Sequence, residues 1–152
     1  MNKKTLKSLQ ALKLKKYRLD HKKFLIEGKR LIQAAVEHNY PIDEMYCTKT
    51  FLKNNKEWTI LKSIALGNVK TLPETDLKKI SSTVTPSGVS AVCKIKSERL
   101  VNFNNAKWIY LDEIKDPGNL GAILRSAAWF NLNNIAISPK SVDIYNPKVI
   151  RS

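Results

Sequence analysis

The feature that most constrains the fold is a pair of short apolar segments flanking a helical pattern. Residues 108–111 read WIYL and are apolar at every position, which is typical of strands buried on both faces of a parallel sheet. Residues 134–137, NIAI, predict the next buried strand. Between them, apolar residues recur at helical spacing: Leu120, Ile123, Leu124, Ala127 and Ala128. The pattern predicts a βαβ unit with a helix over residues 119–130.

The region before this unit also alternates between strand and helix patterns. It predicts strands over 23–28, 42–48, 69–72 and 89–95, and helices over 3–19, 29–39, 55–66 and 73–82. We therefore expect a compact α/β unit of about 95 residues. A polar, Asn-rich stretch follows it, which is typical of a linker, and we place a domain boundary near residue 100.

The last residues, YNPKVIRS, predict the start of a helix with Asn146 as N-cap and Pro147 in its first turn. The chain stops soon after this helix begins, and two strands with one complete helix are too few for an independent core. We therefore expect the sequence to be truncated inside its second domain.

Positive charge is concentrated in the first 30 residues. The chain carries 27 Lys plus Arg against 13 Asp plus Glu, a formal net charge of +14. Eleven of the bases are Lys3, Lys4, Lys7, Lys13, Lys15, Lys16, Arg18, Lys22, Lys23, Lys29 and Arg30. Such a surface favours a nucleic acid partner. An anionic membrane surface and an ordinary solvated basic face are the alternatives.

Other sequence signals exclude several classes of protein. Cys47 and Cys93 lack the spacing of a metal site, and His21 and His38 have no partners nearby in sequence, so we predict no metal and two buried free thiols. No apolar run approaches the roughly 18 residues that span a membrane. The N-terminus lacks the apolar stretch of a signal peptide. We expect a cytoplasmic protein.

The segment DEIKDPGNLG directly follows the apolar strand of residues 108–111, the position of ligand sites in parallel α/β sheets. Pro117 and Gly118 predict a tight turn, Gly121 permits close backbone approach, and the helix start suits an anion such as phosphate. Arg125 lies about 140° from the centre of the apolar stripe and should point away from the core.

Periodicity leaves other interpretations of this segment open. Arg125 can be an ordinary surface arginine or can pair with Asp112 or Glu113. The GxxG pattern at residues 118–121 also occurs in KH-type nucleic acid clamps, but so short a match recurs by chance. Dinucleotide and P-loop motifs are absent from the sequence.

Two longer stretches carry a family resemblance. The run LDEIKDPGNLGAILRSA, with VDIYNPKVIRS after it, resembles motif 1 and its sequel in the TrmH/SpoU branch of the SPOUT methyltransferases, which transfer methyl from S-adenosylmethionine to RNA. KFLIEGKRLIQAA and KKISSTVTPSGVSAV resemble the family's L30e-like substrate-binding domain. The resemblance implies an L30e-like α/β/α sandwich over residues 1–97 that binds RNA, a linker over 98–107, and the first βαβ portion of a SPOUT (α/β knot) domain over 108–152, with the knot missing.

The resemblance also implies roles for two residues. Asn119 and Arg125 match the asparagine and arginine of motif 1, and the arginine is assigned to catalysis at a ribose 2′-hydroxyl. A guanidinium readily stabilises developing alkoxide charge and grips phosphate, but it hardly loses its proton. We therefore assign Arg125 to substrate positioning and charge stabilisation before proton abstraction, and Asn119 to holding the loop or the phosphate.

The family's S-adenosylmethionine site and its homodimer are both built by the remainder of the catalytic domain. No cofactor-binding residue is therefore assigned in this chain, which we expect to bind RNA, from rRNA or tRNA, without binding the cofactor or turning over alone. Two other functions stay open: a non-enzymatic L30e-like protein that binds structured RNA, and a basic interaction protein without nucleic acid specificity.

Overall fold

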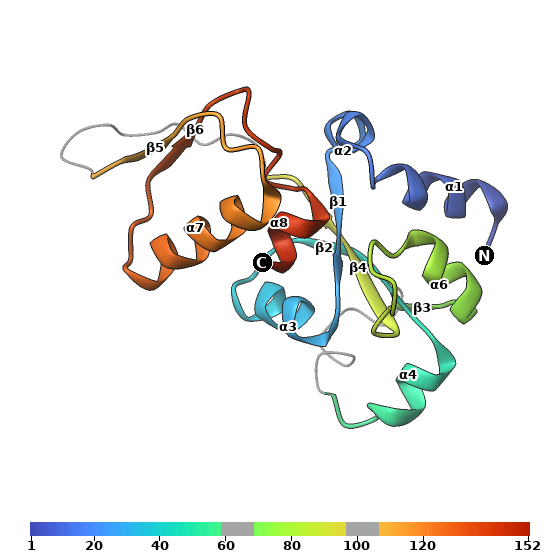
Figure 1. Cartoon of the computed structure of the whole chain (residues 1–152). Coiled ribbons are helices and arrows are strands. Elements are labelled where there is room, and N and C mark those ends of the chain that lie inside the picture. Colours follow the sequence, from blue (N-terminus) through green and yellow to red (C-terminus); the bar gives the residue numbers. More distant parts are fainter. Residues whose placement is uncertain (59–68, 97–106) are drawn as a thin grey trace. The chain divides into compact units, whose positions relative to one another are not determined.

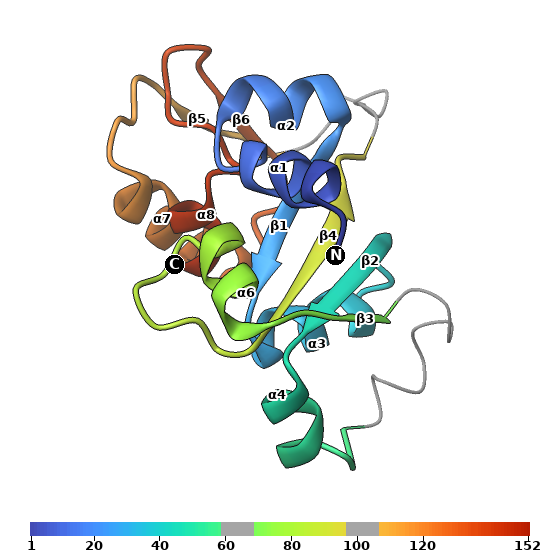
Figure 2. The ribbon, with the colours of Figure 1, turned by 90° about the vertical axis from the view of Figure 1, so that its right-hand side faces the viewer.

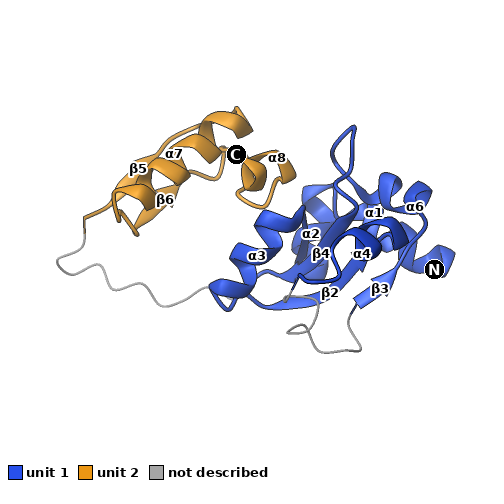
Figure 3. Ribbon diagram, turned by 90° about the horizontal axis from the view of Figure 1, so that it is seen from below, with its two compact units in different colours: residues 1–95 blue, residues 96–152 orange. Residues whose placement is uncertain are grey.

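The computed structural model describes residues 1–58, 69–96 and 107–152. It divides into two compact units, residues 1–95 and 96–152, which Figure 3 colours separately and which are described one at a time below. Most of the predicted linker over 98–107 lies outside the described residues, so this boundary stays a prediction.

A four-stranded mixed sheet forms the centre of the first unit. Its strands are β1 (Lys23–Glu27), β2 (Ile42–Cys47), β3 (Val69–Thr71) and β4 (Val89–Lys94), in the order β1-β4-β2-β3 (Figure 1). Strand β4 is antiparallel to both of its neighbours, and β2 is parallel to β3. All four strands were predicted, each within two residues of its observed ends.

Helices cover both faces of this sheet. On one face, α1 (Lys3–Ala11) and α6 (Glu74–Ile80) pack onto the strands through a buried cluster made of Leu9, Leu12, Leu25, Tyr46, Leu72, Leu77, Ile80 and Val92. Helix α3 (Lys29–Glu37) lies on the opposite face, with Ile32 fully buried (Figures 1 and 2). The result is a three-layer α/β/α arrangement with a substantial core.

The predicted single helix over residues 3–19 is wrong, because the segment forms two helices. Helix α1 ends at Ala11, and α2 spans Lys15–His21. Arg18 of α2 is only 2% exposed, and its Nη1 donates to the carbonyl oxygens of two residues between the helices, Leu12 at 2.9 Å and Lys13 at 2.7 Å. These bonds satisfy carbonyls that a continuous helix would have bonded itself, and they stabilise the break.

Helix α4 (Lys49–Asn54) was not predicted. Thr48 caps it by accepting from the backbone N–H of Phe51 at 3.0 Å. The helix predicted over 55–66 is wrong at residues 55–58, where 55–57 form a turn and 58 is irregular, while the rest of that range lies outside the described residues. The Asn55 amide donates to the Phe51 carbonyl at 2.9 Å and thereby closes the helix end.

The second unit contains the predicted βαβ arrangement. Strands β5 (Ile109–Leu111) and β6 (Ile135–Ile137) are parallel, and α7 (Pro117–Trp129) connects them, followed by α8 (Pro147–Arg151). Leu111 of β5, Leu120 of α7 and Val149 of α8 form the centre of its core.

The prediction that the strand of residues 108–111 is buried on both faces is wrong, because Tyr110 is 64% exposed. Its side chain alternates to the face opposite Ile109 and Leu111, which pack with α7. Ala128, expected in the apolar stripe of this helix, is also exposed. In the part of the chain that the structure describes, no helix has both the length and the apolar character needed to cross a membrane.

Candidate functional site

The start of α7 follows the carboxyl end of β5, where the sequence predicted a site. Asp116 is the N-cap, and its carboxylate accepts from the backbone N–H of Asn119 at 2.8 Å. Pro117 and Gly118 therefore form the first turn of the helix, and the tight turn predicted before it is wrong. The Asn119 N–H, assisted by Lys148 Nζ at 3.6 Å, lowers the pKa of the Asp116 carboxyl.

This cap changes the expectation of a phosphate at the helix start. A helix N-terminus attracts an anion through its unpaired N–H groups and its partial positive charge. In this helix a carboxylate of the chain itself occupies that position. The geometry therefore favours a role for Asp116 in shaping the loop over binding of a phosphate at the same N–H groups.

Two serines that the sequence reasoning missed join the loops after β5 and β6. Ser138 Oγ accepts from the backbone N–H of Glu113 at 2.8 Å, and Ser141 Oγ accepts from that of Ile114 at 3.0 Å. The two hydroxyls lie 3.0 Å apart, and both residues are buried. The only sequence signal was their position directly after the second parallel strand, in the segment SPKS.

Ion pairs also connect the loops after β5 and β6. Glu113 lies 2.8 Å from Lys140 Nζ and 3.5 Å from Lys115 Nζ, and Lys115 also donates to the Lys140 carbonyl at 2.9 Å. Lys140 and then Lys115 lower the pKa of Glu113. Because its carboxylate is engaged by these lysines, Glu113 does not serve as the partner of Arg125.

Arg125 lies on the exposed side of α7, and its Nη1 donates to the backbone carbonyl of Ser152. Asn119 is also exposed, and its side chain makes no hydrogen bond within the described residues. Six residues separate the two on one helix, which places them about 120° apart around the axis and about 9 Å apart along it. The two side chains therefore leave α7 on different faces. A ligand that contacts both of them must extend around the helix.

Gly121, where the sequence predicted close backbone approach, permits a close contact between α7 and α8. A Cβ atom at this position would lie 2.7 Å from the Val149 carbonyl oxygen and 2.4 Å from Ser152 Cβ. No side chain fits in that space. The glycine thereby brings the end of α8 to the helix that carries Arg125.

The eleven predicted RNA-binding residues fall into separate groups. Lys3, Lys4, Lys7, Lys13, Lys15, Lys16 and Lys22 are exposed on or between α1, α2 and the start of β1. Lys23 begins β1 and lies 2.5 Å from Asp43. Lys29 and Arg30 are exposed beyond the other end of that strand.

Arg18 does not belong in the RNA-binding set. Its guanidinium is buried and bonded to main-chain carbonyls, so it offers no surface charge to a polyanion. The prediction for this residue is corrected to a structural role. The other ten residues stay candidates, divided between the two ends of β1.

These features define a two-unit α/β protein whose second unit gathers polar residues at the carboxyl ends of parallel strands. Residues 3–91 match the MRM3-like substrate binding domain, and residues 106–152 match the SpoU rRNA Methylase family. The chain belongs to the family of proteins with an MRM3-like substrate-binding domain, and its remaining residues are similar to the SpoU rRNA methylases.

Two relatives illustrate the likeness. The Bacillus subtilis 23S rRNA (guanosine(2553)-2'-O)-methyltransferase RlmP is 29% identical over 147 residues, which are 96% of this chain and 56% of the relative. The human mitochondrial rRNA methyltransferase 3 is 30% identical over 153 residues, which are 95% of this chain and 35% of the relative. The chain thus spans about half the length of the bacterial relative and about a third of the human one.

Solved structures show the same fold. An RNA 2'-O ribose methyltransferase is 29% identical, with a TM-score of 0.78 over 98% of this chain and 57% of that one. The SpoU methyltransferase AviRb from Streptomyces viridochromogenes, in complex with AdoMet, is 23% identical, with a TM-score of 0.82 over 99% of this chain and 58% of that one. This second likeness shows the fold alone.

Proposed function

We propose that the protein carrying these 152 residues is an S-adenosylmethionine-dependent RNA ribose 2′-O-methyltransferase with rRNA as its substrate. The observation that carries the proposal is the placement of Asn119 and Arg125 on α7, directly after parallel strand β5, inside the SpoU-matching residues. Relatives named as rRNA methyltransferases favour this function over a protein that only binds RNA.

In this proposal the first unit binds the RNA and the second unit takes part in methyl transfer. Residues 1–97, as an L30e-like domain, bind the RNA through exposed basic side chains at the ends of β1. Residues 108–152 are the opening part of a SPOUT domain and contribute the arginine that acts at the ribose. Dimerisation through the catalytic domain and a cytoplasmic location stay predictions, and mitochondrial proteins are among the relatives.

Arg125 is suited to stabilising charge. A 2′-hydroxyl must lose its proton to a base to become a good nucleophile for a methyl group, and its oxygen gains negative charge as the proton leaves. A fixed guanidinium next to that oxygen lowers the energy of this state. Its Nη1 donates to the Ser152 carbonyl, and because a guanidinium has five N–H donors, others are available for a ribose or phosphate oxygen. S-adenosylmethionine supplies the methyl group when bound, and we assign none of the described residues to holding it.

The test is methyl transfer to rRNA by the protein expressed from its complete reading frame. Arg125→Ala should lower the rate at least about 100-fold, the usual effect of removing one charge-stabilising donor, while RNA affinity stays within a few-fold. Lys107→Ala, which removes an exposed charge from the same unit, is the control and should keep its activity. Near-normal turnover by Arg125→Ala would refute the assignment.

A further inference from the structure

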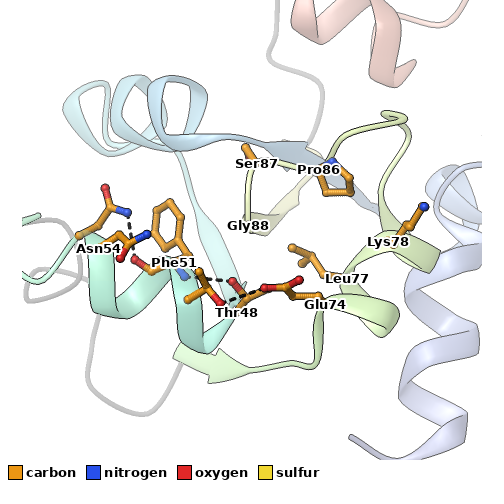
Figure 4. Close-up of a pocket in the computed structure, with 11 residues that line it drawn as sticks. Thr48, Phe51, Asn54, Glu74, Leu77, Lys78, Pro86, Ser87 and Gly88 are labelled. Carbon is orange, nitrogen blue, oxygen red and sulfur yellow. Dashed lines mark hydrogen bonds between the residues drawn. The ribbon is translucent and has the colours of Figure 1, made fainter.

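A pocket in the first unit belongs to none of the sites described above. It lies between α4, α6 and the segment of residues 86–88, and it encloses about 430 Å³, which is within the range of small-ligand pockets. Figure 4 shows residues of α4 on one side, residues of α6 on the other, and Pro86, Ser87 and Gly88 beside them. Three separate segments of the first unit therefore build one cavity.

The inner wall of the pocket is apolar. Phe51 and Leu77 contribute to it and are 8% and 1% exposed. Gly88 has a φ of 86°, and a Cβ there would lie 3.0 Å from Phe51 Cβ. Its carbonyl accepts from the Thr48 N–H at 2.9 Å, which fixes the segment against the start of α4. The pocket thus has a rigid wall against which a flat ring can pack.

The rim is polar and has unused hydrogen-bonding capacity. Glu74 Oε1 accepts from the Thr50 hydroxyl at 2.9 Å, and within residues 1–58, 69–96 and 107–152 this carboxylate forms no ion pair. The Asn54 amide, which also lines the pocket, makes no hydrogen bond to any described residue. Lys78 completes the rim. A carboxylate accepts N–H groups, and an amide both donates and accepts.

Hydrogen bonds fix the chain next to the pocket, and exposed lysines lie around it. Glu27 accepts from the Ser82 backbone N–H at 2.8 Å and from the Ser81 and Ser82 hydroxyls, which ties the segment before the pocket to the end of β1. Lys49 and Lys53 are exposed on α4 near the pocket. These lysines can contact phosphates, whereas Glu74 in the rim repels a phosphate from the cavity itself.

We propose that this pocket receives an unpaired nucleobase of the bound RNA. The proposal rests on the proposed function, because it takes RNA as the substrate. A nucleobase is a flat ring that packs on an apolar wall, and its edge carries the N–H donors and acceptors that Glu74 and Asn54 complement. A base held in a duplex presents neither its face nor its pairing edge, so the pocket selects RNA with an unpaired base beside a helix.

The experiment compares two RNA hairpins that differ only by one bulged nucleotide, with each of the four bases tested in the bulge. Binding of the full chain is measured by fluorescence anisotropy. At least one bulged hairpin should bind about tenfold more tightly than the fully paired one, the effect of seating one base. The double variant Asn54→Ala/Glu74→Gln should abolish that preference, and Asn54→Trp should do the same by filling the pocket.

The ratio of the two affinities isolates the pocket from bulk charge. Removing the charge of Glu74 strengthens binding of both hairpins, so the matched control is Glu37→Gln, the same change at the far end of α3. This control should keep the preference for the bulge. Thermal unfolding of each variant confirms that it folds.

Three outcomes would overturn the proposal. Equal affinity of both hairpins for the unmodified chain, or a preference that survives in both pocket variants, refutes the pocket and leaves RNA binding intact. Absence of binding to any hairpin refutes RNA binding by this chain as well.

Discussion

Substitution of Arg18 tests whether this residue stabilises the fold or binds RNA. Arg18→Lys keeps the positive charge but loses the planar fork of donors, and Arg18→Met keeps the apolar stem and loses both. If Arg18 acts as the structure indicates, both variants lose stability because the carbonyls of Leu12 and Lys13 lose their partner. If it acted as a surface charge, Arg18→Lys would be harmless.

The expected loss in the free energy of unfolding can be worked out from the two hydrogen bonds of Arg18. A hydrogen bond to a charged group contributes about 1.5–3 kcal/mol, so two bonds set an upper limit of about 6 kcal/mol. Releasing a charge that is 2% exposed also removes its desolvation cost, and we expect a net loss of about 3 kcal/mol for Arg18→Met. For a domain of this size, that loss lowers Tm by roughly 10–20 °C.

The assay is thermal and urea unfolding followed by circular dichroism, with RNA binding measured well below both transitions. Lys16→Met, the same loss of charge at an exposed position of α2, should change the free energy of unfolding by less than about 0.5 kcal/mol. The reasoning fails if Arg18→Met unfolds at the temperature of the unmodified chain, or if Arg18→Lys is fully stable.

Three further predictions concern other positions. Gly121→Ala should destabilise the second unit by about 1–3 kcal/mol, since the new methyl group would lie 2.7 Å from the Val149 carbonyl oxygen; an unchanged urea midpoint would contradict this. The pKa of Asp116 is lowered in the folded state, so its stabilising contribution is present above the ordinary value of 3.8 and is lost as the pH falls through the folded value. Asp116→Asn keeps a capping side chain and should flatten that part of the dependence of Tm on pH. Cys47 and Cys93 are buried, and burial raises the pKa of Cys93 to about 12, so both should react with a disulfide reagent only after denaturation; rapid labelling of the native chain would refute their burial.

Elements with strong local signals could be predicted from the sequence. The βαβ unit was predicted because its strand segments are largely apolar and its helix has a clear apolar stripe. Close backbone approach at Gly121 was predicted because only a glycine leaves room for a neighbouring backbone. The helix start was misplaced by two residues, because the helix begins at Pro117 with Asp116 as its cap.

Features that depend on distant residues could not be predicted. The break between α1 and α2 depends on a buried arginine whose bonds reach back five and six residues. Ser138 and Ser141 lie 25 and 27 residues from the N–H groups they bond, and nothing in their local sequence indicates those partners. The pocket combines residues from three segments, so no motif describes it.

The serine hydroxyls that join the loops after β5 and β6 also affect the entropy of binding. Ordering a free loop costs about 1–2 kcal/mol per residue of backbone entropy, and a binding site that becomes ordered only with its ligand loses that free energy from the affinity. Here the Ser138 and Ser141 hydroxyls accept from the N–H groups of Glu113 and Ile114, so bonds within the chain itself order the loop. The backbone entropy of this loop is therefore lost during folding and not during binding. A ligand at the carboxyl end of β5 binds to a loop that is already ordered.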